Sequence, residues 1–155
     1  MKHVTLSEFI DELAPAATLD AGARGVALTV RPVEAGVTIE ADREILASVM
    51  GNLLQNAFKF TRPRSTVVLA VHASAERVVL EIEDECGGLP SGNVDDLFRP
   101  YEQRGTDRTG VGLGLAFSRW AVQANHGRIA TRNLPGKGCV FAVNLPRYPQ
   151  PARGH

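Results

Sequence analysis

The chain has 155 residues, of which 44% are hydrophobic and 22% are charged, a composition typical of one globular domain with its own core. Its 17 basic side chains balance 17 acidic ones, so it lacks the basic field that a nucleic-acid partner requires. Two cysteines exclude a disulfide framework, and no apolar run approaches the roughly 20 residues of a membrane span.

The apolar pattern predicts helices and strands interrupted by one long loop. In chain order the predicted segments are a helix over 7–21, strands over 25–32 and 36–42, a helix over 43–61, strands over 65–74 and 76–85, a loop over 86–110, a helix over 112–125, and strands over 128–133 and 138–146. Thr5 and Glu8 have capping-box spacing before the first helix, and Pro15 either kinks that helix or starts a second one. Asp42 is the expected N-cap of the second helix, and Gly127 is expected to end the third. The order predicts an α+β sandwich with helices on one face of a mixed sheet.

Three polar side chains interrupt the apolar stretch "NLLQNAFKF", which runs from residue 52 to residue 60. Asn52, Asn56 and Lys59 follow i, i+4, i+7 spacing, so they share one stripe at the edge of the buried helix face. A satisfied network of structural hydrogen bonds explains such a stripe. Binding of a ligand that contains a metal ion and phosphate explains the stripe equally well. Amide oxygens suit a hard cation, and an ammonium group suits phosphate oxygens.

Two glycine clusters favour the second explanation. The stretch "EDECGGLP" (83–90) ends a predicted strand with acidic residues and two glycines, which let a backbone approach a flat ligand. The stretch "GVGLGL" (110–115) opens a helix, and backbone amides at a helix start bind anions. Each cluster alone is a weak signal, and the second is not the dinucleotide-binding fingerprint.

Taken together, "NLLQNAFKF", "DECGGLP", "LFRPYEQ" and "GVGLGL", in this order, resemble the catalytic and ATP-binding domain of sensor histidine kinases. That domain belongs to the Bergerat-fold group of ATPases, with gyrase, the heat-shock chaperone and the mismatch-repair ATPases. The resemblance implies a two-layer α/β sandwich with a mixed, mostly antiparallel sheet, helices on one face and a mobile ATP lid. It places the domain over 1–146 and leaves 147–155 as a disordered tail.

The resemblance also implies roles for individual residues. Asn56 would coordinate Mg²⁺, while Asn52 and Lys59 would face the phosphates as the catalytic pair. Asp84 would accept a hydrogen bond from the adenine amine, and Gly88 would let the chain turn under the base. The remaining ATP-binding residues implied in this way are Cys86, Phe98, Arg104, Arg108, Gly110, Gly112, Gly114 and Leu115.

The sequence departs from the family pattern at two cysteines. Cys86 replaces the first glycine of the adenine box, which costs strain of order 1 kcal/mol if that position needs a positive φ. Alternatively, Cys86 simply lines the adenine pocket. Cys139 stands where a threonine is common, and we interpret it as structural together with Gly136 and Gly138. Trp120 is predicted to belong to the core.

The function implied by the resemblance is transfer of the γ-phosphate of Mg-ATP to a histidine on a separate dimerisation domain. "VTLSEFIDEL" looks like the exit from that domain, and none of the four histidines here is a good acceptor. A response regulator would act downstream. The chain is expected to be cytoplasmic without direct membrane contact, and any membrane anchor of the parent protein is expected to lie outside this segment. The alternatives are a stand-alone ATPase or serine kinase of the same fold, or a degenerate nucleotide-binding interaction module.

Overall fold

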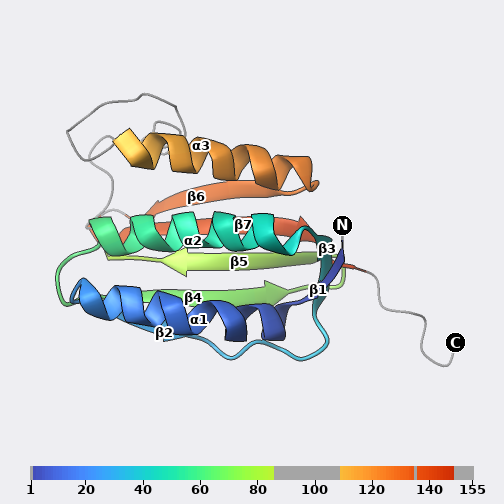
Figure 1. Cartoon of the computed structure of the whole chain (residues 1–155), viewed down its shortest axis with the longest axis horizontal. Coiled ribbons are helices and arrows are strands. Elements are labelled where there is room, and N and C mark those ends of the chain that lie inside the picture. The colour runs from blue at the N-terminus through green and yellow to red at the C-terminus, as the bar shows by residue number, and fades with distance from the viewer. Residues whose placement is uncertain (1, 86–108, 135, 149–155) are drawn as a thin grey trace, which may run out of the picture.

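A computed structural model describes residues 2–85, 109–134 and 136–148 and shows three helices and seven strands within these ranges. The elements are β1 (Lys2–Thr5), α1 (Leu6–Ala23), β2 (Ala27–Val30), β3 (Thr38–Ala41), α2 (Arg43–Phe60), β4 (Thr66–Ala73), β5 (Arg77–Glu83), α3 (Thr109–Ala124), β6 (Arg128–Leu134) and β7 (Gly138–Pro146). The three helices lie over one face of the main sheet (Figure 1). The predicted α+β sandwich is therefore confirmed.

The main sheet has five strands in the order β2-β4-β5-β7-β6. The β2–β4 pair is parallel and the other three pairs are antiparallel, so the sheet is mixed and mostly antiparallel, as predicted. Both predicted hairpins, β4–β5 and β6–β7, are present. Because β5 and β7 are central neighbours, the end of β5 lies beside the start of β7, where Glu83 pairs with Val140.

The strands predicted over 25–32 and 36–42 are shorter than expected and join different sheets. The first, β2, ends before Pro32, which has no N–H to donate to a ladder. The second, β3, pairs antiparallel with β1 in a small two-stranded sheet. Strand β1 was not predicted, because only Val4 of its four residues is buried and so short a segment shows too little alternation.

The helix starts differ in how far they follow the sequence signals. Asp42 is the N-cap of α2, and its Oδ1 accepts a hydrogen bond from the N–H of Ile45 at 3.0 Å, as predicted. Thr5 occupies the N-cap of α1, but its side chain makes no capping hydrogen bond, so the capping-box prediction is wrong. Pro15 lies inside one continuous helix and does not start a second one.

The end of α3 corrects the prediction for Gly127. His126 adopts the left-handed conformation at φ 63°, and the N–H of Gly127 donates to the carbonyl of Val122 at 2.9 Å. This is the Schellman pattern with histidine in the position that glycine usually takes. Gly127 is required for another reason, since a Cβ there would lie 2.5 Å from the carbonyl oxygen of Asn144.

The core lies between the helices and the facing side of the sheet. Alternate residues of β5, namely Val78, Leu80 and Ile82, are fully buried and face the apolar side of α2, where Met50 and Leu53 are also fully buried. Within the described ranges, we find no helix long and apolar enough to cross a bilayer.

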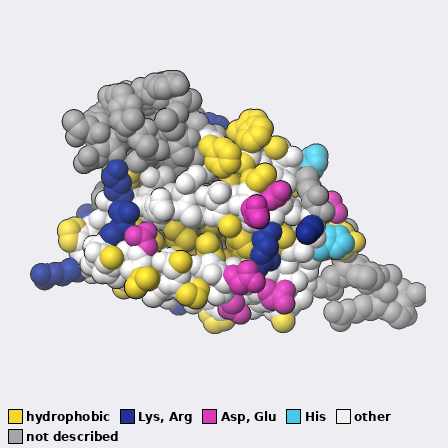
Figure 2. Space-filling view, viewed as in Figure 1, with side chains coloured by type: hydrophobic (Ala, Val, Ile, Leu, Met, Phe, Trp, Pro, Cys, Tyr) yellow, Lys and Arg dark blue, Asp and Glu magenta, His cyan; other side chains and the backbone are white. Residues whose placement is uncertain are grey.

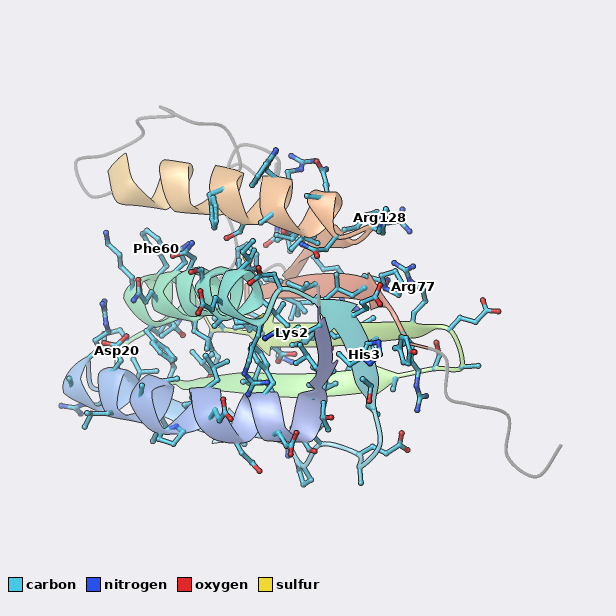
Figure 3. The ribbon with its side chains drawn as sticks, turned by 45° about the vertical axis from the view of Figure 1, so that its right-hand side comes forward. Lys2, His3, Asp20, Phe60, Arg77 and Arg128 are labelled. Carbon is cyan, nitrogen blue, oxygen red and sulfur yellow. The ribbon has the colours of Figure 1, made fainter. Side chains whose placement is uncertain are left out.

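The two ends of the described chain meet at the small sheet. Arg147, which follows β7, bridges to Ile39 of β3, and the N–H of Tyr148 donates to the carbonyl of Thr38 at 2.8 Å. The Tyr148 ring lies 3.9 Å from the His3 ring, centroid to centroid. Figure 3 shows Lys2 and His3 on this small sheet. The first two residues of the predicted tail are thus held by hydrogen bonds, whereas 149–155 lie outside the described residues.

Candidate functional site

The candidate site lies at the end of the molecule where α2 and β5 finish and where β7 and α3 begin (Figure 1). The polar stripe of α2 is on the last three turns of that helix. Asn52 and Asn56 are half-buried and Lys59 is exposed, so the stripe emerges from the core toward the end of the helix. The structure therefore places the three predicted side chains on one accessible edge of α2.

The two asparagines of the stripe differ in their contacts. The Nδ2 group of Asn52 donates to the Oγ of Ser118 on α3 at 3.5 Å, and Ser118 is fully buried. The side chain of Asn56 makes no hydrogen bond to another described residue. Because the amide of Asn56 remains within reach of solvent, it is available to a ligand.

Lys59 lies one turn further along the stripe, next to Phe60 in the last turn of α2. Its Nζ is 5.7 Å from the centroid of the Phe60 ring. Figure 3 shows Phe60 at the end of α2 where α3 begins. Lys and Arg side chains gather at this end of the molecule (Figure 2), and Arg62 and Arg64 follow α2 directly. This end of the molecule thus carries several positively charged side chains.

Helix α3 begins at Thr109, three residues earlier than predicted. Gly110, Gly112, Gly114 and Leu115 all lie in its first two turns. Because α3 runs beside α2, with Asn52 contacting Ser118, these turns are at the same end of the molecule as the polar stripe (Figure 1). Backbone amides in the first turn of a helix are an anion-binding feature.

Asp84 directly follows β5 and is buried, with 5% of its surface exposed. Its Oδ1 accepts a hydrogen bond from the N–H of Cys139 at 3.0 Å, and its own N–H donates to the carbonyl of Cys139 at 2.9 Å. A carboxylate held this far from water is expensive unless it is well hydrogen-bonded. The bond from Cys139 fixes Oδ1, and the bond from its own N–H fixes the backbone of Asp84.

Gly138 makes this arrangement possible. A Cβ on Gly138 would lie 1.9 Å from the carbonyl oxygen of Asp84, well inside van der Waals contact. The structural interpretation of Gly138 and buried Cys139 fits these contacts. Gly136 adopts a positive φ of 75° in the turn before β7, which glycine tolerates without strain.

Several predicted site residues lie outside the described part of the chain. They are Cys86, Gly88, Phe98, Arg104 and Arg108, which belong to the predicted loop and lid over 86–110. The prediction for Trp120 is wrong, because its side chain is 64% exposed on α3, next to the 41% exposed Phe117. Its apolar character was mistaken for a core signal. Hydrophobic side chains gather over α3 in Figure 2.

Two polar residues near the site, Ser118 and Thr61, were not predicted from the sequence. Ser118 is a small polar residue within an apolar helix, and its burial beside Asn52 depends on how α2 and α3 pack. Thr61 directly follows the polar stripe, and its hydroxyl accepts a hydrogen bond from the N–H of Glu85 at 3.0 Å. In the sequence, the only signal for Thr61 is a hydroxyl residue at the end of a predicted helix, and that signal is not specific.

The chain matches a family of known proteins over most of its length. Residues 41–149 match the family described as histidine kinase-, DNA gyrase B-, and HSP90-like ATPase. The chain is 32% identical over 124 residues to the alginate biosynthesis sensor protein KinB of Pseudomonas aeruginosa, covering 80% of this chain and 21% of that protein. It is 34% identical over 114 residues to the adaptive-response sensory kinase SasA of Synechococcus elongatus, covering 72% of this chain and 30% of that one.

Solved structures show the same fold. The catalytic domain of the histidine kinase ThkA superposes with a TM-score of 0.81 at 22% identity, covering 94% of this chain and 95% of that domain. Full-length ShkA in complex with AMPPNP gives a TM-score of 0.79 at 24% identity, covering 97% of this chain and 32% of ShkA.

Fold and site together define an ATP-binding catalytic domain of the type found in sensor histidine kinases. The chain belongs to the family of histidine kinase-, DNA gyrase B- and HSP90-like ATPases. The resemblance found in the sequence is thus confirmed. The chain spans 21% and 30% of the two curated relatives named above, which therefore contain much more than this domain.

Proposed function

We propose that this chain, over residues 1–146, is the catalytic domain of a sensor histidine kinase and presents the γ-phosphate of Mg-ATP to a histidine on a separate dimerisation domain. The observation that carries the proposal is the convergence of three features at one end of the fold. These are the polar stripe of α2, the glycine-rich start of α3 and the buried Asp84 after β5.

The polar stripe suits the phosphates and their metal. Asn56 offers a carbonyl oxygen, the ligand type that Mg²⁺ prefers, and this side chain has no other hydrogen-bond partner among the described residues. Asn52 is oriented by Ser118, and Lys59 adds a positive charge on the same edge. When bound, the metal ion neutralises charge on the phosphate oxygens, as phosphoryl transfer requires.

The side chains favour transfer to an acceptor over hydrolysis. An amide such as Asn52 cannot remove a proton from water, so it cannot act as a general base. Catalysis then rests on holding the γ-phosphate in line with an incoming nucleophile. Arg104 or Arg108 is proposed to reach the phosphates, and Phe98 to anchor the lid.

The base would be recognised by Asp84, whose carboxylate accepts hydrogen bonds from N–H donors such as the adenine amine. Cys86, Gly88, Gly110, Gly112, Gly114 and Leu115 complete the proposed ATP site. The partner is a histidine-bearing dimerisation domain of the parent protein, and a response regulator would receive the phosphate afterwards. The similarity of the chain to the sensor protein KinB and to the sensory kinase SasA supports these partners.

Calorimetric titration with ATP, with and without Mg²⁺, tests the nucleotide site. Incubation with γ-labelled ATP and the dimerisation domain of the parent protein tests the transfer. We expect Mg²⁺-dependent binding and acid-labile label on the partner domain. Release of free phosphate without labelling of that domain would favour a stand-alone ATPase, and no binding would favour an interaction module.

A further inference from the structure

A closed ring of hydrogen bonds joins the segment after α2 to the end of β5. The N–H of Glu85 donates to the Thr61 hydroxyl at 3.0 Å, and the N–H of Arg62 donates to the carbonyl of Glu85 at 3.1 Å. The Thr61 and Ser65 hydroxyls lie 2.6 Å apart, and Ser65 donates to the carbonyl of Arg62 at 2.6 Å. Thr61 is buried, with 8% of its surface exposed.

The direction of each bond in the ring follows from the number of protons available. Ser65 has one hydroxyl proton and donates it to the carbonyl of Arg62, so the short bond between the two hydroxyls must use the proton of Thr61. Thr61 therefore accepts from Glu85 and donates to Ser65. Each hydroxyl both donates and accepts, an arrangement in which neighbouring bonds strengthen one another.

This ring holds the residue next to Asp84. On one side, β7 fixes Asp84 through the two hydrogen bonds with Cys139 and the close approach of Gly138. On the other side, the ring fixes Glu85 against Thr61. Thr61 directly follows α2, the helix that carries Asn52, Asn56 and Lys59. The ring, together with the hydrogen bond from the N–H of Thr66 to the Glu85 carboxylate at 2.8 Å, thus holds the end of β5 against the segment that follows α2.

We propose that Thr61 is a positioning residue that determines base specificity by holding Asp84 at a fixed place relative to α2. It acts through Glu85 and makes no contact with the nucleotide itself. The proposal rests on the proposed function, because it assumes that Asp84 reads the adenine amine while the stripe of α2 binds the phosphates. Its consequence is that losing one hydroxyl weakens the preference for ATP over GTP, besides weakening the fold.

The test compares three variants of this chain for ATP and GTP binding by calorimetry with Mg²⁺ present. Thr61→Val keeps the side-chain shape and removes the hydroxyl, while Thr61→Ser keeps the hydroxyl. Thr131→Val is the matched control, because the buried hydroxyl oxygen of Thr131 has no hydrogen-bond partner in the described part of the chain. We expect Thr61→Val to weaken ATP binding about tenfold, the scale of one lost hydrogen bond, and to narrow the ratio of ATP to GTP affinity.

Thr61→Ser and Thr131→Val should both retain the wild-type ratio. If Thr61→Val does not fold, Ser65→Ala tests the positioning role instead. It removes the hydroxyl that accepts from Thr61 and donates to Arg62, so it should also narrow the ratio of ATP to GTP affinity. An unchanged ratio in whichever of these two variants folds would overturn the positioning role alone. A wild-type chain that binds no ATP would overturn the proposed function, and the positioning role with it.

Discussion

Asp84 and Cys139 hold each other through a pair of reciprocal hydrogen bonds, from the N–H of Asp84 to the Cys139 carbonyl at 2.9 Å and from the N–H of Cys139 to Oδ1 of Asp84 at 3.0 Å. The first bond continues the ladder between β5 and β7 by one residue beyond Glu83. The second uses a carboxylate oxygen in place of a backbone carbonyl. A charged side chain is thus built into the end of a central strand pair.

We expect Asp84→Asn to weaken ATP binding by at most about 3 kcal/mol, the scale of a hydrogen bond to a charged group. The amide oxygen can still accept from Cys139, so the fold should persist, while the negative charge that attracts the adenine amine is lost. Calorimetry with ATP and GTP measures the effect. Glu83→Gln, the same chemical change on an exposed neighbour, should leave both affinities unchanged. GTP competing as well as ATP in the wild type would contradict the adenine pocket.

We expect Asn56→Ala to abolish the Mg²⁺-dependent part of ATP binding while the domain stays folded. The substitution removes the proposed metal ligand, and alanine has the higher helix propensity, so α2 should persist. Calorimetry with and without Mg²⁺ gives the readout, and thermal unfolding confirms the fold. Gln55→Ala alters an exposed amide on the same helix and should bind as the wild type does. Equal affinities for Asn56→Ala and wild type would remove Asn56 from the metal site.

The helices and long strands could be predicted because their signals are local. The N-cap at Asp42 and the β4–β5 hairpin are encoded within a few residues of where they occur. The small sheet could not be predicted, because β1 and β3 are short and depend on pairing across α1. The exposure of Trp120 also depends on which face of α3 packs inward, which hydrophobicity alone does not reveal.

In the candidate site, the polar stripe of α2 could be predicted from local spacing, whereas the contacts that hold Asp84 and Thr61 could not. The spacing of Asn52, Asn56 and Lys59 defines one helix edge, and the structure places them there. The reason that Asp84 is fixed lies in contacts with Cys139, which is 55 residues away along the chain. Thr61 meets Glu85 across 24 residues. Such contacts follow from the register of distant strands, which no local pattern encodes.

We expect the chain alone to acquire no acid-labile phosphate from γ-labelled ATP. His72 is the penultimate residue of strand β4 and pairs with Glu81 at 3.1 Å, and His126 lies in the turn that follows α3, so neither is presented on a helix face to an incoming phosphate. His3 is packed against Tyr148. Label on any of these histidines, or on His155, would contradict a separate acceptor domain. Phosphopeptide mapping under neutral conditions provides the measurement.

We expect Gly138→Ala to destabilise the domain by about 1–3 kcal/mol, since the added Cβ would lie 1.9 Å from the Asp84 carbonyl and the strand pair must move. The movement also displaces Asp84, so ATP affinity should fall with stability. Gly51→Ala is the contrasting variant, because its Cβ would meet nothing within 4 Å and α2 would gain about 0.5–1 kcal/mol of helix propensity. Urea denaturation separates the two, and equal stabilities would contradict the close approach.

We expect a thiol reagent to modify Cys86 and bound Mg-ATP to slow that reaction. Cys86 is two residues after Asp84, so a nucleotide whose base contacts Asp84 would shield a thiol that borders the same pocket. Cys139 supplies an internal control, because it is 1% exposed and should remain unmodified in the folded domain. Labelling followed by mass spectrometry, with and without Mg-ATP, measures both sites at once, and Cys86→Ala confirms the assignment. Identical rates with and without nucleotide would place Cys86 away from the base and leave strain at a glycine position as the remaining consequence of this substitution.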